Sequence, residues 1–95
     1  MIKVVAKMIL SPEAKDAALP VLEELIATTV QEDGCVNYNF CQDNGKSDHY
    51  AIIETWETQE ALDIHSASEH FARLVPQLAD LATGDILIFA YTVLI

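Results

Sequence analysis

The sequence has little positive charge and no apolar run long enough to cross a membrane. Its 5 Lys and Arg residues stand against 15 Asp and Glu residues, for a formal net charge of -10. With Arg73 as the only arginine, the chain has too few cations to neutralise a phosphate backbone, so we expect no nucleic-acid partner. We also expect no membrane span, no secretory signal and a cytoplasmic location, since there is neither an 18-residue apolar run nor a basic-then-apolar leader.

Cysteines and cofactor motifs are also scarce. The 2 cysteines, Cys35 and Cys41, lie on one predicted strand, about 20 Å apart at ~3.3 Å per residue, which is too far for a disulfide. The sequence lacks a CxxC pair, a Gly-rich phosphate loop, a dinucleotide-binding fingerprint and a histidine pair at i, i+4. We therefore expect reduced thiols, no metal and no cofactor of the usual kinds.

Strand-like and helix-like segments alternate along the chain. Branched apolar residues predict a strand over 2–10, and Ser11-Pro12 favours a helix from there to Gly34, kinked at Pro20. The runs 35–42 and 49–56, joined by a turn at Asn44-Gly45, predict an antiparallel hairpin.

Two further helices and a last strand complete the pattern. Thr58 can cap a short helix through His65, and a second helix to Gly84 starts at a capping box of Ser66 and Glu69, with Ser68 as a competing cap. The run 86–95 predicts the final strand. The order predicts one α+β domain over 1–95, a ferredoxin-like βαββαβ fold whose four-stranded antiparallel sheet carries its helices on one face.

In the last predicted strand and in much of the first, the residues that point to either face of the sheet are apolar. An antiparallel sheet with one face in water alternates apolar and polar residues, so both faces of this sheet need cover. Because the helices lie on one face, we predict a homodimer in which a second copy covers the other, as in a dimeric α/β barrel.

Strand 49–56 carries two different faces. We assign the bulkier set to a cavity between sheet and partner and the smaller set to packing under the helices; the sets are Tyr50, Ile52, Glu54, Trp56 and Ala51, Ile53, Thr55. Glu54 is either an acid with a raised pKa or, as we favour, the ion-pair partner of Lys3 or Lys7. On strand 35–42, parity does not choose between Asn37/Asn39 and Tyr38/Phe40.

Two histidines flank the break between the short helix and the next one. His65, near a helix C-terminus that favours the charged form, is either a surface or capping residue or a group directed at Trp56. His70 lies in a first helical turn, where the dipole disfavours the imidazolium. We therefore expect His70 to be neutral and able to accept a proton, unless it is only a first-turn residue.

Three stretches, EDGCVNYNF (32–40), ETW (54–56) and ALDIHSASEHF (61–71), resemble the antibiotic biosynthesis monooxygenase (ABM) domain family in their order along the chain. That family comprises small dimeric α/β-barrel proteins, among them quinol monooxygenases, anthrone oxygenases and a branch that processes signal molecules. The resemblance implies oxidation of a small aromatic substrate by O₂ without a cofactor. It implies Trp56 as a stacking wall and His65 as the proton acceptor or hydrogen-bond partner, with Asn37, Tyr38, His70 and Phe71 as weaker substrate-binding candidates. From its place beside Trp56 on the same strand face, we add Glu54 to the substrate-binding candidates.

Three functions follow as hypotheses. The first is a cofactor-independent monooxygenase that acts on a quinol- or anthrone-like compound. The second is an isomerase or processing enzyme for a small oxygenated metabolite, which uses the same cavity but consumes no O₂. The third is a small-molecule binding protein without turnover.

Overall fold

The computed structural model describes all residues from 1 to 95. Seven elements follow one another: β1 (Ile2–Ile9), α1 (Pro12–Thr29), β2 (Cys35–Gln42), β3 (His49–Trp56), α2 (Gln59–Ser66), α3 (Glu69–Leu81) and β4 (Leu87–Thr92). The strands form one antiparallel sheet in the order β2-β3-β1-β4. The predicted ferredoxin-like α+β fold is confirmed, and no helix is both long enough and apolar enough to span a membrane.

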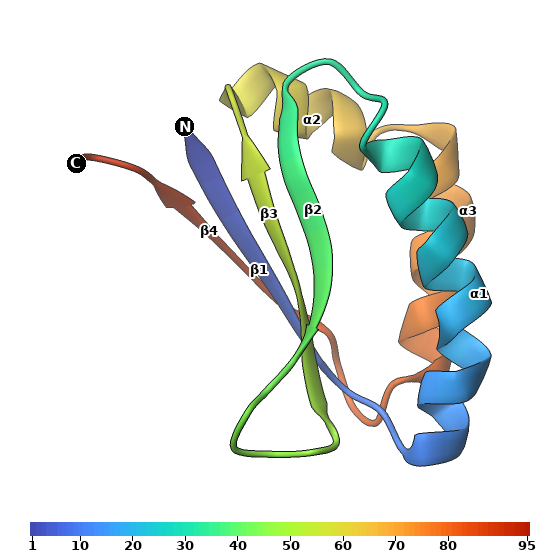
Figure 1. Ribbon diagram of the computed structural model, residues 1–95. Coiled ribbons are helices and arrows are strands. Elements are labelled where there is room, and N and C mark those ends of the chain that lie inside the picture. The colour runs from blue at the N-terminus through green and yellow to red at the C-terminus, as the bar shows by residue number, and fades with distance from the viewer.

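The helices lie together on one face of the sheet (Figure 1). α1 and α3 run side by side across that face, and α2 sits at the end where β3 stops. The opposite face carries no element, and the chain beyond β4 leads away from the sheet. The layers are therefore one sheet and one set of helices, with the hydrophobic core between them.

Each helix begins directly after a serine or threonine that caps its first turn. Ser11 caps α1, with its hydroxyl accepting a hydrogen bond from the Ala14 amide, and Thr58 caps α2 in the same way. The cap of α3 is Ser68 and not Ser66, so the predicted capping box is wrong. The reason is that Ser66 is still the last residue of α2, where its hydroxyl donates to the Leu62 carbonyl. α3 ends at Leu81, before the predicted Gly84.

The assignment of the two faces of β3 is reversed in the structure. Glu54 pairs across the sheet with Val4, and Ile52 with Ala6, and all four side chains are buried under the helices. The bulky set is on this side because it supplies the large apolar area that the helices bury. Ile53, expected under the helices, is 41% exposed on the opposite face.

The expected ion pair between Glu54 and Lys3 or Lys7 is wrong for the same reason. Lys3 is paired with Thr55 and Lys7 with Ala51, so both lysines project from the helix-free face. Lys3 Nζ donates to Thr55 Oγ1 over 2.9 Å. Glu54 is on the other side of the sheet and 5% exposed.

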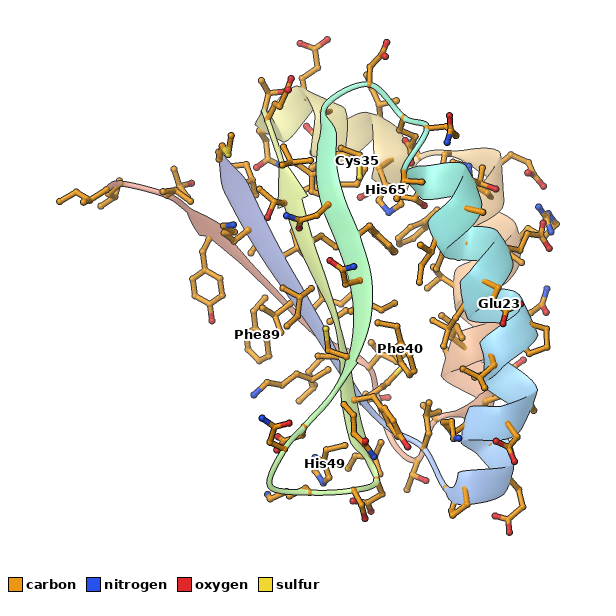
Figure 2. The ribbon with its side chains drawn as sticks, viewed as in Figure 1. Glu23, Cys35, Phe40, His49, His65 and Phe89 are labelled. Carbon is orange, nitrogen blue, oxygen red and sulfur yellow. The ribbon has the colours of Figure 1, made fainter.

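The helix-free face carries several large, exposed apolar side chains besides Lys3 and Lys7. Phe89 and Tyr91 of β4 are 41% and 57% exposed and lie on the same side of the sheet as Ile53. Figure 2 shows Phe89 directed away from the helices, whereas Phe40 is directed towards them. This surface agrees with the reasoning that led to a homodimer, and the pairing itself stays a prediction.

Candidate active site

A cavity of about 130 Å³ lies between the helix-facing side of the sheet and the helices α2 and α3. Of its 15 lining residues 12 are hydrophobic, and the other three are Glu54, His65 and Ser66. Glu54 and Trp56, which we assigned to a cavity between sheet and partner, therefore lie on the helix side of the sheet, and a cavity at the partner side stays a prediction. The chain forms this cavity by itself because the β3 face that carries Glu54 packs under the helices.

His65 is brought to the cavity by the break between α2 and α3. It lies in the last turn of α2, and its backbone carbonyl accepts a hydrogen bond from the Ser68 hydroxyl over 2.6 Å. Ser68 in turn caps α3, whose first turn carries His70. The ring centroids of the two histidines are 5.8 Å apart as a result.

Glu32 connects both histidines. Its Oε2 atom lies 2.6 Å from His65 Nδ1 and 2.9 Å from His70 Nε2. Glu32 stands in the turn between α1 and β2, where its backbone amide donates to the Thr29 carbonyl. Sequence reasoning missed this role, because the contacts join residues 33 and 38 positions apart. The available signal was that Glu32 opens the first ABM-like stretch.

The His65 ring is buried, with 1% of its surface exposed. Burial lowers the pKa of His65, and the hydrogen bond to Glu32 opposes that shift without cancelling it. The neutral form is therefore favoured, contrary to the charged form expected from the helix terminus. With the Nδ1 proton donated to Glu32, Nε2 carries a lone pair, and this buried atom has no hydrogen-bond partner in the protein.

Trp56 lies behind the cavity wall. It is 0% exposed and is not among the lining residues, so the stacking role implied for it has no surface to act through. Its ring centroid is 4.7 Å from that of His65, as expected for a histidine directed at the indole. Trp56 Nε1 donates to Glu54 Oε1 over 2.9 Å and so fixes the carboxyl group.

Glu54 is a second titratable group in the cavity wall. Burial raises its pKa to about 7, the nearby Glu32 carboxylate adds to the rise, and the hydrogen bond from Trp56 opposes it. Near neutral pH, this carboxyl group can therefore both give and take a proton.

The other candidates divide between the two faces of the sheet. Tyr38 and Phe71 line the cavity and meet His65 edge-on, at centroid distances of 5.4 and 5.3 Å. Asn37 is exposed on the helix-free face. Of the two alternatives on strand 35–42, it is therefore the set with Tyr38 that faces the cavity, and not the set with Asn37. His70 does not line the cavity and is linked to His65, which does, by the shared contact with Glu32.

The arrangement supplies a base in an apolar, aromatic enclosure. The rings of Tyr38, Trp56 and Phe71 pack against the His65 ring at centroid distances of 5.4, 4.7 and 5.3 Å. Glu32, His65 and His70 also form the one group of side chains that could hold a metal ion, with ligand atoms within 4.8 Å of one another.

Comparisons with known proteins bear on the family and the fold of the chain. The sequence profile described as antibiotic biosynthesis monooxygenase matches residues 1–77. A crystal structure described as an antibiotic biosynthesis monooxygenase is 38% identical, with a TM-score of 0.89 and 99% of each chain covered. The protein named "Putative monooxygenase Rv0793" from Mycobacterium tuberculosis is 27% identical over 90% of this chain and 83% of its own length. An uncharacterized Synechocystis protein, sll1783, is 27% identical over 74% of this chain, which spans only 48% of that protein.

Proposed function

Because this chain belongs to the antibiotic biosynthesis monooxygenase family, with a monooxygenase-like function supported by its relatives, we propose that it is a cofactor-independent monooxygenase of small aromatic quinols. The observation that carries the proposal is the state of His65. Its Nδ1 contacts Glu32, its Nε2 is a buried nitrogen without a hydrogen-bond partner, and the residue lines an apolar cavity. A carboxylate-oriented imidazole of this kind acts as a general base on a phenolic hydroxyl.

The proposed reaction starts when His65 Nε2 takes the phenolic proton. The resulting anion is rich in electrons and reduces O₂ directly, and the oxygen then adds to the ring. One oxygen atom stays in the product and the other leaves as water. For a hydroquinone, C₆H₆O₂ and O₂ give the hydroxyquinone C₆H₄O₃ and H₂O, so that O₂ accepts all four electrons and no other reductant is needed. Glu54, with a pKa of about 7, returns a proton to the departing oxygen.

The size of the cavity favours a substrate with one ring. A cavity near 150 Å³ holds a benzene-sized molecule, and this one measures about 130 Å³. Three-ring anthrones would extend from it past Ile88 of β4, which lines the cavity and is 59% exposed. We therefore rank monocyclic quinols above anthrones as substrates.

Oxygen consumption with a panel of substituted hydroquinones tests the proposal. We expect uptake above the spontaneous rate, and with ¹⁸O₂ we expect one labelled oxygen atom in the product. A panel in which no compound gives uptake above the spontaneous rate contradicts the oxygenase.

An isomerase that moves a proton on a small oxygenated metabolite is the second candidate. The observation that favours it is the presence of two proton carriers, His65 and Glu54, in one cavity wall. Such an enzyme exchanges substrate hydrogen with deuterium from D₂O and consumes no O₂. Exchange without oxygen uptake therefore selects the isomerase.

A further inference from the structure

The Glu32, His65 and His70 side chains converge on the outer side of the His65 ring. Glu32 and His70 are 15% and 12% exposed, whereas neither lines the cavity. The cluster is therefore reached from solvent and not through the substrate space. We propose that it binds a divalent first-row transition ion of the zinc type, and that the bound ion switches off His65 as the base of the proposed reaction.

The donor set suits such an ion. Two imidazole nitrogens and one carboxylate oxygen, with a fourth position left open, are a common zinc ligand set. In a tetrahedral site with ligands at about 2.0–2.1 Å, the ligand atoms lie roughly 3.3 Å apart. Here Glu32 Oε2 is 2.6 and 2.9 Å from the two histidine nitrogens, and all three atoms lie within 4.8 Å of one another. The two oxygen–nitrogen distances therefore need only to lengthen slightly for an ion to fit between the three ligand atoms.

The surroundings also favour a cation. The chain carries a formal net charge of -10, so its field attracts divalent ions towards the surface. The three ligands come from the α1–β2 turn, from α2 and from α3, which fold together around the site. Ser68 Oγ lies 3.3 Å from His70 Nε2 and helps to keep that ring close to Glu32.

Binding at Nδ1 changes the cavity side of His65. In the metal-free protein the ring proton sits on Nδ1, facing Glu32, and Nε2 is the proton acceptor. An ion on Nδ1 needs the lone pair of that atom, so the ring proton moves to Nε2. The cavity then presents an N–H donor in place of a base, and no proton enters or leaves the protein. This consequence rests on the proposed function, whereas the binding of the ion does not.

Titration with Co²⁺ and Zn²⁺ tests the binding. We expect one Co²⁺ per chain with the absorption bands of a tetrahedral site, displaced by one Zn²⁺, and a change in the fluorescence of Trp56, the only tryptophan. Glu32→Gln and His70→Gln should each weaken Zn²⁺ binding at least tenfold. His49→Gln is the matched control, because His49 lies at the start of β3 and outside the cluster. Unchanged affinity in both cluster variants, with unchanged circular dichroism, overturns the site.

Oxygen uptake then tests the switch. We expect full turnover in EDTA, loss of turnover in proportion to bound Zn²⁺, and recovery when EDTA is added again. Turnover that EDTA abolishes and metal restores overturns the switch. Absence of turnover in every condition counts against the proposed function, while the Co²⁺ spectrum still decides the binding site by itself.

Discussion

His65 differs from His49 in the surroundings of its two ring nitrogens. Nδ1 contacts a carboxylate and Nε2 meets no protein atom that can bond to it, in a ring that is 1% exposed. His49, by contrast, is partly exposed and lies 3.8 Å from the Asp48 carboxylate. A buried nitrogen without a hydrogen-bond partner destabilises the folded protein, which is a reason to expect that this atom acts on a ligand.

Replacing His65 by Gln should lower kcat of quinol oxidation by about 10²–10⁴-fold, the usual contribution of a general base. KM should change less, because the apolar lining that binds the ring stays in place. Initial-rate measurements across a range of quinol concentrations check this.

His49→Gln is the control and should leave both constants unchanged. A His65→Gln enzyme that keeps its kcat while KM rises would show that the imidazole binds the substrate and does not deprotonate it.

Glu54 makes stability depend on pH. Its pKa in the folded protein, about 7, is above the reference value of 4.5, so the folded state holds this proton more tightly than the unfolded state does. The stability tied to the protonated carboxyl is complete below pH 4.5 and is lost as the pH rises through 7.

The variant Glu54→Gln removes this dependence while keeping an acceptor for Trp56 Nε1. Relative to the wild type, its free energy of unfolding should rise by about 2–3 kcal/mol between pH 5 and pH 8. Urea denaturation at the two pH values measures the difference. Glu57→Gln, at an exposed position, is the control and should show no such change. Parallel pH curves for the wild type and Glu54→Gln would contradict the raised pKa.

A glycine in the turn between α1 and β2 allows this turn to pack closely against α2. Gly34 has φ of +84°, and a Cβ there would lie 2.6 Å from Ala61 Cβ on α2. Its carbonyl accepts a hydrogen bond from the Glu57 amide over 2.8 Å. This close approach fixes the turn that carries Glu32 against the helix that carries His65.

Gly34→Ala should destabilise the protein by more than about 2 kcal/mol, because left-handed strain of about 1–2 kcal/mol adds to the clash with Ala61. Gly84→Ala separates the two causes, since Gly84 has φ of +72° but no atom within 4 Å of the added Cβ. Chemical denaturation of both variants measures the difference.

A second change isolates the clash. In the Ala61→Gly background, Gly34→Ala should cost no more than Gly84→Ala does. If Gly34→Ala lowers the free energy of unfolding equally in the two backgrounds, the contact with Ala61 contributes nothing and α2 does not hold the turn.

Local signals predicted the elements well and the contacts between them poorly. The hairpin bounds at 35–42 and 49–56 are confirmed, because strand-like runs and the Asn44-Gly45 turn are local features. The face of β3 that the helices cover was wrong, because parity sorts residues into two sets without saying which set is buried. Glu32 was missed, since its partners depend on how the α1–β2 turn meets the α2–α3 break.

The exposed sheet face concerns the whole molecule. The large apolar side chains Ile53, Leu87, Phe89 and Tyr91 are each at least 41% exposed on one face that no helix covers. Soluble monomers rarely expose contiguous apolar area of this kind. We propose that two copies pair through this face, and that the cavities, which lie on the other side of each sheet, stay separate.

Light scattering on a sizing column at micromolar concentration should give twice the chain mass of 10.5 kDa. Phe89→Asp, which places a charge among the exposed apolar side chains of this face, should halve the measured mass. Ile64→Asp is the matched control, because Ile64 is 61% exposed on α2, away from this face. A wild-type protein that runs as a single chain would contradict the pairing.

β4 borders the sheet and pairs only with β1, so the hydrogen-bonding groups along its outer edge have no partner strand. From Ile86 to Ile95 the chain has no charged residue, proline or glycine to interrupt extended stacking. Segments of this composition assemble into cross-β fibrils when their edges meet. The terminal strand that completes the fold is thus also the segment from which we expect amyloid to nucleate, and a single lysine placed on its edge would act as a gatekeeper.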